Sequence, residues 1–233
     1  MQTPLALDAF RSQSLEQDRG GGPFELESER MLDINLAGEV WIKTGTMVAY
    51  TGSIGFVRER ILEQGVGTML KKMVSGAGTS LTKATGTGSL FCADEGKKIT
   101  LLELRGEAVY VNGNDLLAFQ PTLDYRIKMM RKVGAALTSG LFNIRLEGHG
   151  LLAVTTHYDP LTFEVTPDAP LVTDPNATVM WSDSLTPQIK TDIQLKTFFG
   201  RGSGESIQMR FEGDGFVTIQ PFEERPVVTT AGG

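Results

Sequence analysis

Apolar and polar residues alternate along much of the chain with a period of two, which is typical of half-buried β-strands. The alternation begins at residues 24–26 and continues through Leu32, Ile34 and Leu36. Similar short apolar runs continue to residue 219, separated by turns rich in Gly, Asn, Asp and Pro. The pattern predicts a mainly β, all-β type of fold.

One phrase of this pattern occurs three times, at residues 40–54, 109–123 and 171–185. Each copy has a short apolar strand, a polar turn, and a second strand ending in an aromatic residue three positions before a Ser or Thr. We interpret each copy as a hairpin, entered in the first copy by a turn at Gly38. The corresponding residues Ala49, Ala118 and Met180 recur at nearly equal intervals along the chain.

A second landmark keeps nearly the same spacing. Gly-x-Gly occurs at positions 86–88, 148–150 and 213–215, and we expect each to form a turn leading into an apolar strand. Two landmarks in phase indicate a triplicated unit. We therefore expect three units in a closed arrangement about a pseudo-threefold axis, which would leave few free sheet edges.

The repeat predicts one β domain at 23–222, divided at approximately 23–94, 95–156 and 157–222. Residues 1–22 are expected to form a tail or one loosely docked helix, and residues 223–233 a disordered C-terminal tail. Each unit also carries an insert before its Gly-x-Gly. The apolar spacing at 61–73 predicts a short amphipathic helix, and residues 127–137 repeat that spacing, whereas Ile189, Ile193 and Leu195 fit a strand at least as well.

Composition narrows the classes of partner. The 27 glycines in 233 residues exceed the usual level of about 7% and favour many tight reversals. The net charge of −6 argues against nucleic acid, because an acidic surface repels phosphate. The single cysteine, Cys92, excludes an internal disulfide framework, and its apolar neighbours predict a buried, inert thiol.

Nothing in the N-terminal segment has the pattern of a secretory signal. The longest uncharged stretch, residues 133–144, is shorter than the roughly 20 residues that a membrane-spanning helix needs. We therefore expect a cytoplasmic protein without a transmembrane segment.

Three stretches resemble a known family: Pro170–Leu185, the loop Gly200–Glu205, and Phe211–Pro221. The family is the altered inheritance of mitochondria protein 24 family, also called domain of unknown function 124, and the resemblance covers about residues 24–222. It implies three consecutive domains like the tryptophan RNA-binding attenuation protein (TRAP), a short variant of the double-stranded β-helix. A fungal relative is linked to organisation of the mitochondrial inner membrane, but fold alone carries no function across.

The residues form no recognisable catalytic or cofactor set. The two histidines, His149 in a Gly-x-Gly and His157 in an expected loop, show no metal-ligand spacing with Asp159. A Gly-x-Ser-x-Gly elbow is absent from the sequence. Residues 65–70 and Gly96-Lys97-Lys98 only partly match phosphate-binding loops, and turns in a glycine-rich β protein explain both. We expect no metal, no cofactor and no enzyme activity.

Two groups are candidates for ligand or partner contact. The first is the loop Gly200, Arg201, Gly202, Ser203, Gly204 and Glu205. Its alternate glycines could expose backbone N–H groups beside Arg201 as an anion-binding nest, or could simply serve a tight connection. The second is the basic set Arg126, Lys128, Arg131 and Lys132. It could contact an anionic membrane or acidic partner, or form a solvated helix face.

The aromatic residues at the repeat positions are assigned mainly to packing rather than to base stacking; they are Trp41, Tyr50, Tyr110, Phe119 and Trp181. Our leading hypothesis is a non-enzymatic binding or scaffold protein that forms homo-oligomers, or binds a protein partner, through its β surfaces. The alternative is a small-ligand or anion receptor that uses the glycine-rich loops. RNA binding by analogy with the fold relative is a weaker third hypothesis.

Overall fold

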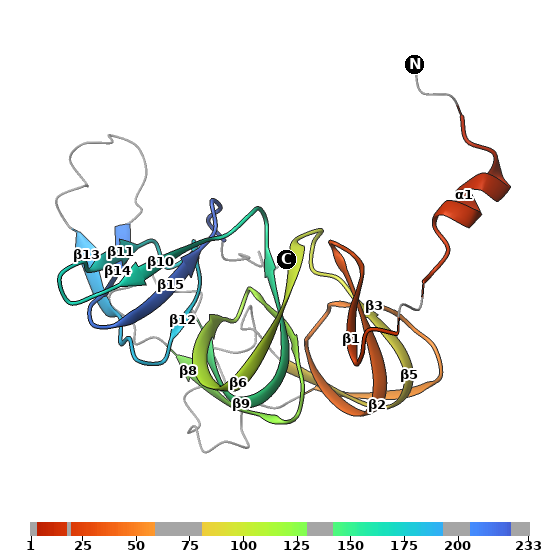
Figure 1. Ribbon diagram of the computed structural model, residues 1–233, viewed down its shortest axis with the longest axis horizontal. Coiled ribbons are helices and arrows are strands. Elements are labelled where there is room, and N and C mark those ends of the chain that lie inside the picture. The colour runs from red at the N-terminus through yellow and green to blue at the C-terminus, as the bar shows by residue number, and fades with distance from the viewer. Residues whose placement is uncertain (1–3, 18–19, 59–80, 130–141, 193–205, 225–233) are drawn as a thin grey trace, which may run out of the picture.

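The computed structural model describes residues 4–17, 20–58, 81–129, 142–192 and 206–224. These residues form one short helix and fifteen strands (Figure 1). The first half comprises α1 (Leu7–Gln13), β1 (Phe24–Ser28), β2 (Met31–Lys43), β3 (Met47–Tyr50), β4 (Ser53–Arg58), β5 (Leu81–Cys92), β6 (Lys98–Asn112) and β7 (Leu116–Phe119). The second half comprises β8 (Leu123–Met129), β9 (Phe142–Thr156), β10 (Leu161–Val165), β11 (Leu171–Thr173), β12 (Thr178–Ser182), β13 (Gln188–Asp192), β14 (Ser206–Phe211) and β15 (Gly215–Ile219). The expectation of a mainly β protein is confirmed.

All described strand pairs are antiparallel, and the strands form two sheets. The larger has twelve strands, with the order β10-β15-β12-β6-β9-β7-β2-β5-β3 along its main path. The smaller has the order β11-β14-β13. Within the described strands, β3 and β10 end the main path of the larger sheet, and β11 is an edge of the smaller one.

The predicted hairpins are wrong: the two strands that flank each repeated turn do not pair with each other in the described part of the chain. β2 and β3 lie on opposite sides of β5, and β6 and β7 lie on opposite sides of β9. In the third copy, β11 pairs with β14 whereas β12 pairs with β15 and β6. Each turn instead lies at the end of a later strand, β5, β9 or β15. A residue at or just past that end donates its backbone N–H to a turn carbonyl: Ala93 to Thr46, Thr155 to Asp115, and Gln220 to Ala177.

The first two Gly-x-Gly segments are not turns either, because they lie inside the long strands β5 and β9. Gly86 and Gly88 have φ values of 145° and 143°, and a Cβ there would lie 1.9 Å from Ser53 O and 2.0 Å from Thr51 O. Glycine is therefore required where the β3–β4 connection and the start of β4 approach β5 closely. Gly38, expected as a turn, pairs with Gly86 inside β2, so the chain continues through it.

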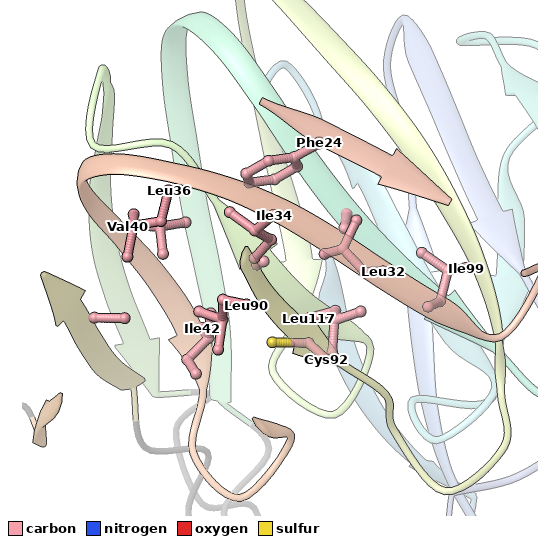
Figure 2. Close-up of a cluster of buried hydrophobic side chains, with 13 residues drawn as sticks. Phe24, Leu32, Ile34, Leu36, Val40, Ile42, Leu90, Cys92, Ile99 and Leu117 are labelled. Atoms are coloured by element: carbon pink, nitrogen blue, oxygen red, sulfur yellow. The ribbon is translucent and has the colours of Figure 1, made fainter. Parts of the chain in front are cut away.

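The apolar core consists of three clusters. Figure 2 shows the first, in which side chains of β1, β2 and β5 point toward one another and enclose the Cys92 sulfur. Its main members are Phe24, Leu32, Ile34, Leu36, Val40, Ile42, Leu90 and Cys92. The second is built around Val111, Phe119, Leu123, Ile144 and Leu152, and the third around Tyr110, Val165, Trp181, Met209 and Phe211. Cys92 is 0% exposed, which confirms its predicted burial, and that burial raises the pKa of its thiol to about 12.

Of the expected helices, the structure shows one in its described residues, α1. Residues 1–22 contain α1, none of whose residues is buried. The helix expected at 61–73 lies outside the described residues. Ile127 belongs to β8, so the second expected helix does not begin there, and Ile189 lies in β13. In both places, pairing with a neighbouring strand (β9 or β14) determines the conformation, and the apolar spacing does not.

Candidate functional site

A group of buried charges lies where segments from distant parts of the sequence meet. We call it the Lys97 cluster, because the Lys97 side chain at its centre is only 2% exposed. The members come from the end of β2, the β5–β6 connection, the β6–β7 turn, and the segment after β15. They are Lys43, Asp94, Lys97, Asp115, Gln220 and Glu224.

Three carboxylates surround the Lys97 ammonium. Its Nζ lies 3.6 Å from Asp94 Oδ2 and 3.4 Å from Asp115 Oδ1, and it also pairs with Glu224. It donates a further hydrogen bond to the carbonyl of Asn114 at 3.2 Å. Charge-assisted contacts of this kind offset the cost of removing an ammonium group from water.

Further contacts hold the carboxylates in place. The Lys43 ammonium lies 2.9 Å from Asp94 Oδ2, and Thr155 donates its hydroxyl to the same oxygen at 3.1 Å. Gln220 Nε2 donates to Asp115 Oδ1 at 3.2 Å. The second oxygen of Asp115, Oδ2, has no hydrogen-bond partner among the described residues.

The pKa values in the cluster follow from burial and charge. Burial raises the pKa of Asp115 to about 7, against the lowering effect of Lys97, and the nearby Glu224 adds to the rise. Burial by itself would lower the pKa of the Lys97 ammonium, but Asp115, Glu224 and Asp94 together raise it above its usual value. Lys97 therefore stays charged at neutral pH, and the pKa of Asp115 lies close to neutral pH.

This geometry makes the cluster cohesive, because each ammonium in it is held by carboxylate and carbonyl oxygens. Glu224 belongs to the predicted C-terminal tail, yet it pairs with Lys97 and lies 3.3 Å from His157 Nε2, so the tail expectation is wrong for this residue. Phe222 packs on the His157 ring at 3.7 Å between centroids. From the sequence, Lys97 was considered only as part of an incomplete phosphate loop, and no local pattern there signals its burial.

Two strand pairs join the apolar clusters. In the first, Trp41 of β2 lies opposite Phe119 of β7, and the rings stack at 6.2 Å with an interplanar angle of 17°. In the second, Tyr110 of β6 lies opposite Trp181 of β12, and the rings stack at 5.4 Å and 18°. We call these the internal junctions. The assignment of these aromatic residues to packing is confirmed.

Basic residues support both junctions. Lys83 lies 4.9 Å above the Trp41 ring, and Lys128 lies 4.8 Å above the Tyr110 ring and contacts its hydroxyl. Arg145 makes a bidentate pair with Asp183 at 2.7 and 2.6 Å, which lowers the pKa of that carboxyl. The junctions are thus held by stacking and by charge.

The predicted basic set is only partly placed. Arg126 and Lys128 lie on strand β8 rather than on a helix face, and Lys128 serves the second junction. Arg131 and Lys132 lie outside the described residues, as do Gly200, Arg201, Gly202, Ser203, Gly204 and Glu205. His149 lies in strand β9, opposite Arg105, and not in a turn. Asp159 pairs with Lys98.

Exposed apolar side chains occur at two places on the outer strands at one end of the larger sheet, beside Leu90 and beside Lys83 of β5. Val48 and Tyr50 of β3 are 56% and 46% exposed, and Val57 of β4 is 69% exposed. Tyr50 occupies the same place in the repeated phrase as Phe119 and Trp181, which are buried. Tyr50 is an exception to the assignment of the repeat aromatic residues to packing, because its ring contacts Phe56 at 5.4 Å between centroids but stays largely exposed. No sequence pattern marks the exposure of Val48 and Val57.

Among the described residues, no group of three or more His, Cys, Asp or Glu side chains is arranged to hold a metal ion. The described part of the chain also contains no helix of the length and apolarity that crossing a membrane requires.

The architecture defines an all-β protein built on long, bent antiparallel strands. The chain belongs to the mitochondrial biogenesis AIM24 family, whose model matches residues 24–222. Among solved structures, the chain is similar to protein SPYM3_0169 from Streptococcus pyogenes, with 22% identity over 86% of this chain and 92% of that one, and a TM-score of 0.62. This similarity supports the fold. The comparison with curated proteins found no match.

Proposed function

We propose that this chain is built from three equivalent β units and acts as a binding and assembly protein, not as an enzyme, by associating with other copies through exposed strand surfaces. The observation that carries this proposal is the apolar surface of β3 and β4. Val48, Tyr50 and Val57 project from strands at the outer side of the sheet. An apolar strand edge of this kind favours pairing with another chain.

The strand registers support the three-unit arrangement. Tyr50, Phe119 and Trp181 lie opposite Leu90, Leu152 and Val217, which recur at the same intervals as the three Gly-x-Gly segments. In each case the pairing shifts register at the same place, two residues into the short strand. The three turn hydrogen bonds from Ala93, Thr155 and Gln220 keep the same spacing. Tandem units of this kind bury each other's faces and leave surfaces at the two ends.

The Lys97 cluster supports a structural role for the buried charges. Its ammonium groups are held by Asp94, Asp115 and Glu224. The contacts join the end of β2, the β5–β6 connection, the β6–β7 turn and the segment after β15. A network of this kind makes the molecule rigid, so that its outer strands are held in fixed positions.

The proposal is tested by measuring the molar mass of the purified chain by light scattering over a wide concentration range. We expect a mass above that of the monomer. Val48→Asp and Val57→Asp should lower the mass, because each places a charge on the apolar strand surface. Tyr158→Asp is the matched control, since Tyr158 is 58% exposed but lies in a bend outside the strands. A wild-type chain that is monomeric throughout would contradict the proposal.

A further inference from the structure

We infer that strand β11 of one copy adds to strand β3 of a second copy, in the register that both internal junctions already use. The inference rests on the proposed self-association and names its contact. It follows from comparing the two internal junctions with the two strand edges that lack a counterpart in the described part of the chain.

The two internal junctions have the same construction. Each joins the strand before one repeated turn, the donor strand, to the strand after the next repeated turn, the acceptor strand. In the first, Trp41 and Ile42 lie opposite Phe119 and Ala118. In the second, Tyr110 and Val111 lie opposite Trp181 and Met180. The two donor strands are one repeat interval apart along the chain, and so are the two acceptor strands, so the junctions are equivalent in the repeat.

The third turn identifies β11 as the remaining donor strand. A backbone hydrogen bond closes each turn, from Thr46 to Lys43, from Asp115 to Asn112, and from Ala177 to Asp174. These hydrogen bonds make Lys43, Asn112 and Asp174 equivalent positions of the repeat. Lys43 and Asn112 are the last residues of the donor strands β2 and β6, and Asp174 directly follows the donor strand β11. Val172 and Thr173 are therefore the equivalents of Tyr110 and Val111.

The first turn identifies β3 as the remaining acceptor strand in the same way. Tyr50 is the equivalent of Phe119, and Ala49 is the equivalent of Ala118. A third junction built like the other two would place Val172 opposite Tyr50 and Thr173 opposite Ala49, antiparallel. One register is specified, because a slip of one residue would turn every side chain to the other face.

The exposures agree with this assignment. Phe119 and Trp181 are 0% and 2% exposed at the internal junctions, whereas Tyr50 is 46% exposed. On the donor side, Tyr110 is 8% exposed and Val172 is 45% exposed. Tyr50 and Val172 are thus exposed at positions where the internal junctions bury the acceptor aromatic residue and bury or partly bury the donor residue. Thr173, like its equivalent Val111, is already buried within its own chain.

The partner is a second copy because the two strands lie far apart in one chain. β3 lies near one end of the molecule and β11 near the other, along its longest axis (Figure 1). In the described part of the chain, β11 pairs only with β14, and β3 only with β5. A donor at one end and an acceptor at the other make a heterologous contact, which produces a ring or a filament.

Disulfide trapping tests the contact and its register. Opposed residues of antiparallel strands have Cα atoms about 4.5–5.5 Å apart, within the range that a disulfide spans. Tyr50→Cys and Val172→Cys are made as separate variants, mixed in equal amounts, oxidised mildly, and run on a non-reducing gel. The buried native Cys92 serves as the background, measured in the wild type. Ala49→Cys mixed with Val172→Cys is the off-register control.

We expect a covalent dimer in the Tyr50→Cys and Val172→Cys mixture, and little in either variant alone or in the control mixture. A dimer of Tyr50→Cys alone would indicate β3-to-β3 pairing and would overturn the inference. So would a cross-linked monomer of the Tyr50→Cys/Val172→Cys double variant, because that requires closure within one chain. Oligomers by light scattering without a cross-link would overturn the inference and leave the proposed function standing. Monomers by both measurements would overturn both.

Discussion

The Lys97 cluster gives the sharpest stability prediction. Lys97→Met keeps a long, flexible side chain of similar length but removes the ammonium from among Asp94, Asp115 and Glu224. The variant would leave these carboxylates close together in a site where the Asp115 side chain is fully buried. Lys43 still neutralises Asp94, and Asp115, whose pKa Lys97 no longer lowers, takes up a proton at neutral pH. The unmatched charge therefore falls mainly on Glu224, which is only 12% exposed.

The cost follows from the distances. Unit charges about 3.5 Å apart attract by roughly 5 kcal/mol at an effective dielectric constant near 20, before the desolvation cost is subtracted. Removing one partner of a buried ion pair typically costs about 3–5 kcal/mol. With an unfolding entropy of about 2.1 cal/mol/K per residue, a chain of 233 residues should lose roughly 6–10 °C in Tm.

Calorimetry at neutral pH, where Lys97 is charged, measures this loss. The matched control is Lys98→Met, one residue along the chain. Lys98 is 35% exposed, and its partner Asp159 is 86% exposed, so water and salt screen that pair. We expect the control to keep the wild-type Tm. If Lys97→Met also unfolds within about 2 °C of wild type, the cluster does not stabilise the fold as argued.

Three further predictions concern single residues. Burial raises the pKa of Asp115 from 3.8 to about 7, so the stability that this carboxyl contributes is complete below its unfolded pKa and is lost as pH rises through 7. In urea unfolding, Asp115→Asn should therefore gain stability relative to wild type between about pH 4 and pH 7, and the difference should stay constant at higher pH. Cys92 should resist iodoacetamide in the folded protein and react after denaturation, as followed by mass spectrometry; fast labelling of the native chain would contradict its burial. Gly88→Ala should lower the free energy of unfolding by more than the roughly 1–3 kcal/mol of backbone strain, because its Cβ would lie 2.0 Å from Thr51 O. Gly38→Ala should cost only the strain, because no atom lies within 4 Å of the added Cβ. Equal losses of the two variants in denaturant titration would refute the steric argument.

Local patterns were sufficient to predict the fold class and the spacing of its landmarks. Alternating apolar residues mark strands wherever one face is buried, and turn residues mark their ends. The spacing of Ala49, Ala118 and Met180 reappears in the positions of the turns and of the short strands β3, β7 and β12. These features depend only on neighbours along the chain, so a single sequence contains them.

Strand pairing was not predictable in the same way. The turn between β2 and β3 has the composition of a hairpin turn, but β5 pairs with both flanking strands and lies between them. Gly86 and Gly88 were expected in a turn because glycine is common there; their actual role is to allow the close approach of β4, which no local pattern indicates. The Lys97 cluster was missed because its carboxylates come from three separate segments.

The composition of the outer strands bears on whether they are used for assembly. Proteins usually protect free strand edges with charged residues or proline, since unpaired edges recruit other chains. The edge strand β3 reads Met47-Val48-Ala49-Tyr50 and contains no charged residue or proline. If its only requirement were solubility, a lysine in place of the half-exposed Tyr50 would serve better. An aromatic residue retained at the position that Phe119 and Trp181 bury at the internal junctions is accounted for if Tyr50 is buried in the same way by the next copy.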